Sequence, residues 1–230
     1  MSDSPHLLLR LEGPLMAFGG PAVDQFRPVQ PWPAISLLTG LLGNALGWRR
    51  QEGARLDRLQ ARLRWAARLD REGVPLTEFQ TAQLGKDDLG WTTRGQPEGR
   101  DGGPDSYKSP HLRWRMHRAD ASVLVALALS PADEAPTLDA LAQALQRPAR
   151  PLFLGRKACL PATPLFAGWQ AAADPLSAVL AGLTAQARPA VFYGDGAGPA
   201  GPVRHLTSDE RRFTLDLHAG RQTVYEWMRS

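Results

Sequence analysis

The spacing of apolar and polar positions predicts a mixed α+β chain. Residues 6–11 are mostly apolar and stop at a glycine–proline pair, which predicts a first strand. From Ala34, after a proline suited to a helix start, apolar residues recur at helical spacing. Alternation over residues 63–69 predicts a half-buried strand, whereas the apolar residues 123–129 predict a buried one. An amphipathic helix is expected over residues 137–146.

The last third of the chain predicts shorter elements. Residues 151–161 are typical of a strand that is broken by a glycine, followed by two cations and stopped by a proline. A further helix is expected over residues 175–187 and a strand over residues 191–193. Residues 213–217 and 223–227 are expected to pair as two terminal strands. These elements predict a smaller C-terminal part.

The stretch of residues 81–110 differs from its surroundings because it is rich in glycine and proline and almost free of aliphatic side chains. It cannot bury a core of its own, and it is long for an idle connection, so it is either a functional protrusion or a loop that binds nothing. Cations and aromatic residues alternate along it, which suits single-stranded nucleic acid. They are Lys86, Trp91, Arg94, Arg100, Tyr107 and Lys108.

Composition narrows the function classes. The chain has 230 residues, of which 43% are hydrophobic and 22% charged, enough for a sizeable core. A single cysteine, Cys159, excludes an internal disulfide and a zinc site built on cysteine pairs, and the histidines form no ligand-spaced set. No secretory signal or membrane-spanning run is present, so we expect a cytoplasmic protein without a cofactor or resident metal.

The charge pattern favours an anionic partner. The net charge is only +4, but 24 of the 27 basic residues are arginines, whose planar side chains bind phosphate in a bidentate manner. Arginines recur at residues 62, 64 and 68 and again at 113 and 115, where His117 shares their predicted strand face. A cationic pair follows the glycine of residues 151–161, and Ser36 lies in the first turn of the predicted helix, where it either caps the helix or binds phosphate.

Several motifs, taken in order, resemble those of one protein family. They are residues 13–19, the serine- and glycine-rich residues 36–47, residues 77–82, residues 118–121 and residues 154–159. In this order they are similar to the CasD family, the subunits that hold the 5′ handle of CRISPR RNA in the type I-E surveillance complex Cascade. The resemblance covers about residues 6–195, and the tail matches only weakly.

The resemblance implies a fold. Members of this family, within the repeat-associated mysterious protein (RAMP) superfamily, have a ferredoxin-like domain of the RNA-recognition type with an inserted β-hairpin thumb and a smaller C-terminal β part. On this chain, the implied ferredoxin-like domain covers residues 1–130, with the thumb at about 81–110. A C-terminal α/β extension would cover residues 131–230 and pack on that domain.

The resemblance also implies a function in antiviral defence. The protein would be a non-catalytic subunit that binds and caps the 5′ handle of CRISPR RNA, contacts the large and backbone subunits of Cascade, and meets target DNA only through the complex. In relatives a cation usually precedes the serine of the first helix, but here Ile35 stands there and Arg27 is a possible substitute. The candidate RNA-binding residues are Arg27, Ser36, Lys86, Trp91, Arg94, Lys108, Arg113, Arg115, His117, Arg156 and Lys157.

Two alternatives stay open from the sequence. A related family member in type I-C systems is a metal-independent endoribonuclease, and such cleavage needs a general base and a cation near the scissile phosphate. His111 or His117, with Lys108 and Tyr107, would be the candidates here. The second alternative is a protein-interaction module whose basic face binds acidic partners.

Overall fold

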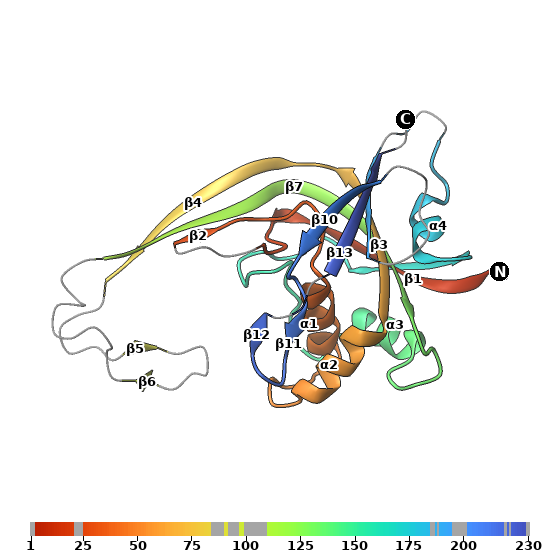
Figure 1. Ribbon diagram of the computed structural model, residues 1–230, viewed down its shortest axis with the longest axis horizontal. Helices are drawn as coiled ribbons and strands as arrows, with labels where there is room; N and C mark the ends of the chain where they lie inside the picture. Colours follow the sequence, from red (N-terminus) through yellow and green to blue (C-terminus); the bar gives the residue numbers. More distant parts are fainter. Residues whose placement is uncertain are drawn as a thin grey trace.

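The computed structural model describes residues 3–20, 25–83, 90–91, 97–98, 110–184, 187, 189–194, 202–218, 220 and 222–228. These residues confirm the α+β class, because four helices accompany a mostly antiparallel sheet of nine strands (Figure 1). Within these ranges, no helix has the length and apolar character needed to cross a membrane.

The main sheet contains strands from both the N-terminal and the C-terminal part of the chain. Its strands follow the order β10-β13-β9-β3-β7-β1-β8, and β2 and β4 also pair with β7. Seven neighbouring pairs are antiparallel, and only the short β2 runs parallel to β7. The strands are β1 (Ser4–Met16), β2 (Phe26–Arg27), β3 (Leu63–Arg71), β4 (Val74–Ala82), β7 (His111–Leu129), β8 (Phe166–Ala172), β9 (Ala190–Tyr193), β10 (Val203–Thr207) and β13 (Gln222–Met228).

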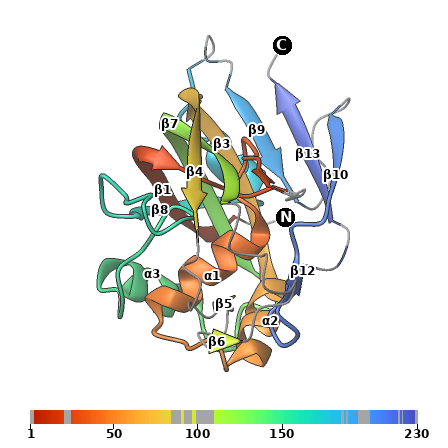
Figure 2. The same cartoon turned by 90° about the vertical axis from the view of Figure 1, so that its left-hand side faces the viewer.

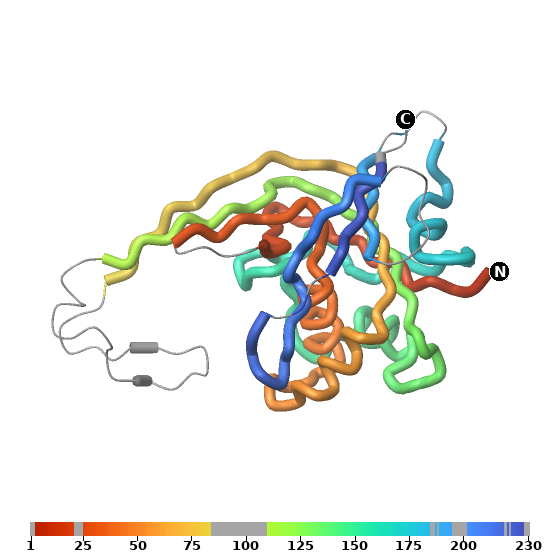
Figure 3. The backbone as a smooth tube through the Cα atoms, in the orientation of Figure 1, coloured from red at the N-terminus to blue at the C-terminus, as the bar shows by residue number. Residues whose placement is uncertain are grey.

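Strand β7 connects the body of the protein to a projecting arm. Its second half lies between β1 and β3, where Leu127 pairs with Leu7 on one side and Trp65 on the other. Its first half pairs with β4 from Ala119 to His111 and with β2 at Trp114 and Arg115. These three strands leave the body as a curved arm, and Figure 3 shows β4 and β7 running together along it. The hairpin therefore begins at Val74, earlier than the sequence suggested for the thumb.

Most of the predicted thumb lies outside the described residues. Only two short strands are described there, β5 (Gly90–Trp91) and β6 (Pro97–Glu98), which pair antiparallel. Lys86, Arg94, Arg100, Tyr107 and Lys108 lie outside the described ranges.

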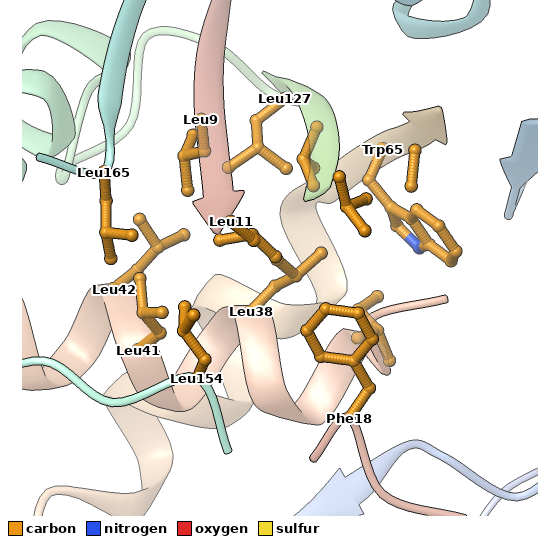
Figure 4. Packing of buried hydrophobic residues seen from close by; sticks show 14 of the residues in the cluster. Leu9, Leu11, Phe18, Leu38, Leu41, Leu42, Trp65, Leu127, Leu154 and Leu165 are labelled. Atoms are coloured by element: carbon orange, nitrogen blue, oxygen red, sulfur yellow. The ribbon is translucent and has the colours of Figure 1, made fainter. Parts of the chain in front are cut away.

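Three helices cover one face of the sheet. They are α1 (Ile35–Ala45), α2 (Gly53–Arg62) and α3 (Leu138–Gln146), and Figure 2 shows them on one side of the strands. The larger core forms here because alternate leucines of β1 point toward α1, as Figure 4 shows for Leu9, Leu11 and Leu38. The short α4 (Pro175–Leu180) packs on the opposite face over a second, smaller cluster.

Three local predictions differ from the structure. Residues 151–161 do not form a strand but a compact loop, in which the chain turns at Gly155 with a φ of +105°. The helix predicted over residues 175–187 ends at Leu180, shortly before Gly182 with a φ of +73°. The predicted terminal pair is also wrong, because residues 213–216 form a turn between β11 (Arg211–Arg212) and β12 (Leu217–His218), whereas β13 pairs with β9 and β10.

Candidate nucleic-acid interface

A groove of about 660 Å³ opens where the end of β1, the first turns of α1 and the loop after Leu152 meet. Four residues predicted from separate parts of the chain line this groove: Arg27, Ser36, Arg156 and Lys157. The structure therefore brings the cationic pair of the loop together with the serine of the first helix and the arginine of β2.

Tight backbone packing holds the loop beside the end of β1. The backbone N–H of Ala17 donates to the carbonyl oxygen of Leu154 over 2.9 Å, and the backbone N–H of Leu154 donates to the carbonyl oxygen of Cys159 over 2.7 Å. A Cβ atom at Gly155 would lie only 1.9 Å from the carbonyl oxygen of Ala17. Only glycine fits this close approach, which places Arg156 at the edge of the groove.

Arg156 connects the loop to the arm. Its guanidinium donates to the backbone oxygen of Met116 over 2.7 Å and to that of Arg27 over 3.2 Å. Burial is the main cause that lowers its pKa, and the neighbouring charges of Arg115 and Arg27 act in the same direction. The guanidinium groups of Arg115 and Arg27 thus lie close enough to repel that of Arg156, and an anion placed beside Arg156 would relieve that repulsion.

His117 lies on the predicted strand face but is buried, with 3% of its surface exposed. Its Nε2 lies 3.0 Å from Nη1 of Arg156. A guanidinium can only donate, so Nε2 accepts and the proton resides on Nδ1. Burial, followed by the charge of Arg156, lowers the pKa of His117, which keeps the ring neutral at pH 7. His117 therefore supports Arg156 rather than facing an open groove.

The two faces of the arm differ in chemistry, as the alternation predicted. Arg113 and Arg115 pair with Gln80 and Glu78 on the face that carries His117. On the opposite face, Trp114 stacks against Phe26 at a centroid distance of 5.2 Å and contacts Phe79 at 4.9 Å. One side of the arm is polar and cationic, and the other side is aromatic.

The arginine row expected around β3 is not a free cationic face. Arg62 ends α2 and is fully buried, where it donates to the backbone oxygen of Pro131 over 3.0 and 3.1 Å. Arg68 contacts the side chain of Asp70 and the backbone oxygen of Val179. Backbone oxygens of Pro131 and Val179 therefore accept hydrogen bonds from two arginines of this row. The alternation in the sequence did not predict these contacts.

Some predicted residues stay untested and others were missed. The side chain of Trp91 belongs to the part of the chain that is not described. Arg211, which pairs with Asp216, and Phe213 also line the groove, but they come from the tail, where the sequence showed no motif. Across the described ranges, no three side chains of His, Cys, Asp or Glu come together in a way that could hold a metal ion.

Comparison with known proteins gives the class first. The chain belongs to the family described as CRISPR-associated protein (Cas_Cas5), whose pattern it matches over residues 6–224. Among individual relatives, it is 33% identical to the CRISPR system Cascade subunit CasD of Escherichia coli strain K12 over 175 residues. That match covers 76% of this chain and 75% of the relative.

Two solved structures of CRISPR-associated proteins have a similar fold. A structure described as a CRISPR RNA-guided surveillance complex has a chain that superposes with a TM-score of 0.69 and 25% identity, over 97% of this chain and 89% of that one. A second, described as the crystal structure of a Cas protein, gives a TM-score of 0.62 and 27% identity, over 97% of this chain and 94% of the other.

Proposed function

We propose that this protein is a non-catalytic subunit of a type I-E CRISPR surveillance complex, Cascade, which binds and caps the 5′ handle of CRISPR RNA. The observation that carries the proposal is the groove in which Arg27, Ser36, Arg156 and Lys157 meet. The likeness to the Cascade subunit CasD supports the assignment to such a complex. In this role the protein contacts the large and backbone subunits and meets target DNA only through the complex.

The chemistry of the groove suits a ribose–phosphate backbone. Arginine and lysine neutralise phosphate, and backbone N–H groups at a helix start add donors. Helix α1 has no side-chain cap at Ala34, and Ser36 lies in its first turn. Ile35, which replaces the cation usual in relatives, is 5% exposed and belongs to the core, so it offers no contact to RNA. Arg27 lines the same groove, which supports the inference that it supplies that charge.

The order of the elements supports a ferredoxin-like domain. Strands β8, β1, β7 and β3 are neighbours in the sheet, and each adjacent pair is antiparallel. Along the chain they follow the sequence β1, helices, β3, β7, helix and β8, which is the β-α-β-β-α-β arrangement of this fold and extends to Ala172, beyond the expected domain end at residue 130. The arm is then an extension of the hairpin between the second and third strands.

The surroundings of His117 favour binding over catalysis. A general base must reach the ribose hydroxyl with an unoccupied nitrogen. His117 is buried, and its accepting nitrogen Nε2 is engaged by Arg156. His111, the other candidate base, is exposed, and its candidate partners Tyr107 and Lys108 lie outside the described ranges. Incubating the purified chain with repeat RNA in EDTA distinguishes the two functions, because one specific cut would show a nuclease.

Charge reversal at Lys157 tests the binding role. Lys157 is exposed, so Lys157→Glu should leave the fold intact. We expect it to weaken handle binding about tenfold and to reduce the salt dependence of binding by roughly one phosphate contact. Arg147→Glu, an exposed change just after α3 and outside the groove, is the matched control. Equal affinities for the two variants and the parent chain would contradict the proposed groove.

A further inference from the structure

A second cavity, of about 400 Å³, lies next to the groove. The two share Phe18, Gly19, Gly20 and Ser36 as lining residues, so they adjoin at the start of α1. The far side of the second cavity is lined by residues 207–209, at the end of β10, and by His218, the last residue of β12. The groove and the cavity together have room for a phosphate and for the group attached to it.

Three buried oxygen atoms of the cavity lining accept no hydrogen bond of normal geometry, although the backbone N–H groups of Ile35 and Asp209 lie near the Asp209 carboxyl. Asp209 is only 6% exposed, yet neither of its carboxylate oxygens accepts a hydrogen bond of normal geometry. The Oε1 atom of Gln30 is also buried without a partner, while the Nε2 atom of this side chain donates to Thr207 over 3.1 Å. Unpaired buried acceptors are costly, and three that line one cavity indicate a ligand that supplies donors.

The surrounding charge decides what kind of ligand supplies those donors. The cavity adjoins the positive end of α1, and the adjoining groove carries Arg27, Arg156 and Lys157. The other titratable groups nearby are His218, which lines the cavity, and Glu210, which follows Asp209 in the chain. A free cation would be repelled by this rim. A molecule with a neutral, donor-rich part and an anionic part suits both surfaces.

We propose that the cavity binds the base of one nucleotide of the RNA whose phosphate lies in the groove, and that this base is guanine. Guanine presents N1–H and the N2 amino group side by side, so it can donate twice to Asp209 and once to Gln30. Adenine and cytosine place a ring acceptor beside their amino group, and uracil has one N–H between two carbonyls. Only guanine matches three clustered acceptors.

Binding requires a local opening. The Asp209 oxygens are closed to solvent, whereas Ser208 and His218 at the rim are exposed. Shifting the segment of residues 207–209 would uncover the carboxylate. The donors of the base would then replace the missing partners, which gives the contact its selectivity.

The proposal rests on the proposed function and is tested separately from it. The probe is the repeat-derived 5′ segment of CRISPR RNA, in which each position in turn carries guanosine or inosine, which lacks only the N2 amino group. With the unmodified full chain, we expect guanosine to bind about tenfold more tightly than inosine at one position. This comparison requires no protein variant and is therefore independent of any folding defect.

Two variants locate the preference. Asp209→Asn should abolish the difference between guanosine and inosine while binding through the groove remains. Glu210 is a neighbouring carboxylate that lines a different cavity, so Glu210→Gln should retain the difference between guanosine and inosine. Equal binding of guanosine and inosine at every position would overturn the base site, although the proposed function would stand if Lys157→Glu still weakened binding. Assembly defects in Asp209→Asn without any base preference would point to a protein donor and would equally overturn the proposal.

Discussion

Asp209 also provides the sharpest test of the energetics of the fold. Burial raises the pKa of its carboxyl to about 6, and the negative charge of Glu210 adds to the shift. The backbone N–H groups of Ile35 and of Asp209 itself lie near the carboxyl and act in the opposite direction. They do not form hydrogen bonds of normal geometry with it, so they stabilise the charged form too weakly to offset its burial. We predict that Asp209→Asn stabilises the protein at neutral pH.

The magnitude follows from the two pKa values. In the unfolded chain the group has its ordinary value of 3.8, and in the folded protein it has about 6. The folded state therefore binds the proton more tightly, so the stability contributed by this group is fully present below about pH 3.8 and is lost as the pH rises through about 6. A difference of about two pKa units corresponds to about 3 kcal/mol. Asparagine does not titrate and avoids this loss.

Urea unfolding across this pH range measures the effect. The free energy of unfolding of Asp209→Asn should exceed that of the parent chain by up to about 3 kcal/mol above pH 7, and the difference should shrink toward about pH 4. Glu210→Gln, a change of the same type at a half-exposed neighbour, should show a much smaller dependence. A difference that does not vary with pH, or a parent chain that is the more stable at neutral pH, would refute the reasoning.

Two further predictions concern packing. In thermal unfolding, Gly155→Ala should destabilise the protein by about 2 kcal/mol or more, because φ is positive and the new Cβ would clash with Ala17. The control Gly168→Ala also has a positive φ but open space around the new Cβ, so it should cost about 1 kcal/mol. Equal costs for the two variants would contradict the close approach of Gly155 to Ala17. Asp57→Ala removes three hydrogen bonds to the turn of the Arg211–His218 hairpin. Amide hydrogen exchange in this turn should therefore accelerate about tenfold or more. Unchanged exchange would show that the hairpin does not depend on Asp57.

Local patterns in the sequence predicted the elements that depend on local forces. The helix at Ile35 and the strand at Leu63 follow directly from apolar spacing, and the helix start and the glycine-flanked cation pair indicated Ser36 and Arg156 as candidates. The loop around Gly155 was mistaken for a strand because its alternating leucines are buried, while its course depends on the close approach of Gly155 to Ala17, just after the end of β1. Periodicity does not report such a contact.

Long-range pairing explains what the sequence did not reveal at the site. Arg62 resembled part of a solvent-facing row, but its partners are backbone carbonyls of a turn about 70 residues further along the chain, near Pro131. Gln30 and Asp209 carry no local signal, because their chemistry arises only when the residues that follow β10 pack beside the start of α1. The many arginines in the sequence predicted an anionic ligand, but the cavity that Gln30 and Asp209 line could not be predicted without the tertiary fold.

The central claim is that the groove recognises the handle of CRISPR RNA rather than RNA in general. Fluorescence anisotropy of the full chain with the repeat-derived 5′ segment and with a scrambled RNA of the same length and composition tests it most directly. The proposed function predicts that the repeat-derived RNA binds about tenfold more tightly at physiological salt and that Lys157→Glu weakens this binding. Equal affinity for the two RNAs, alone and in the assembled complex, would contradict the claim.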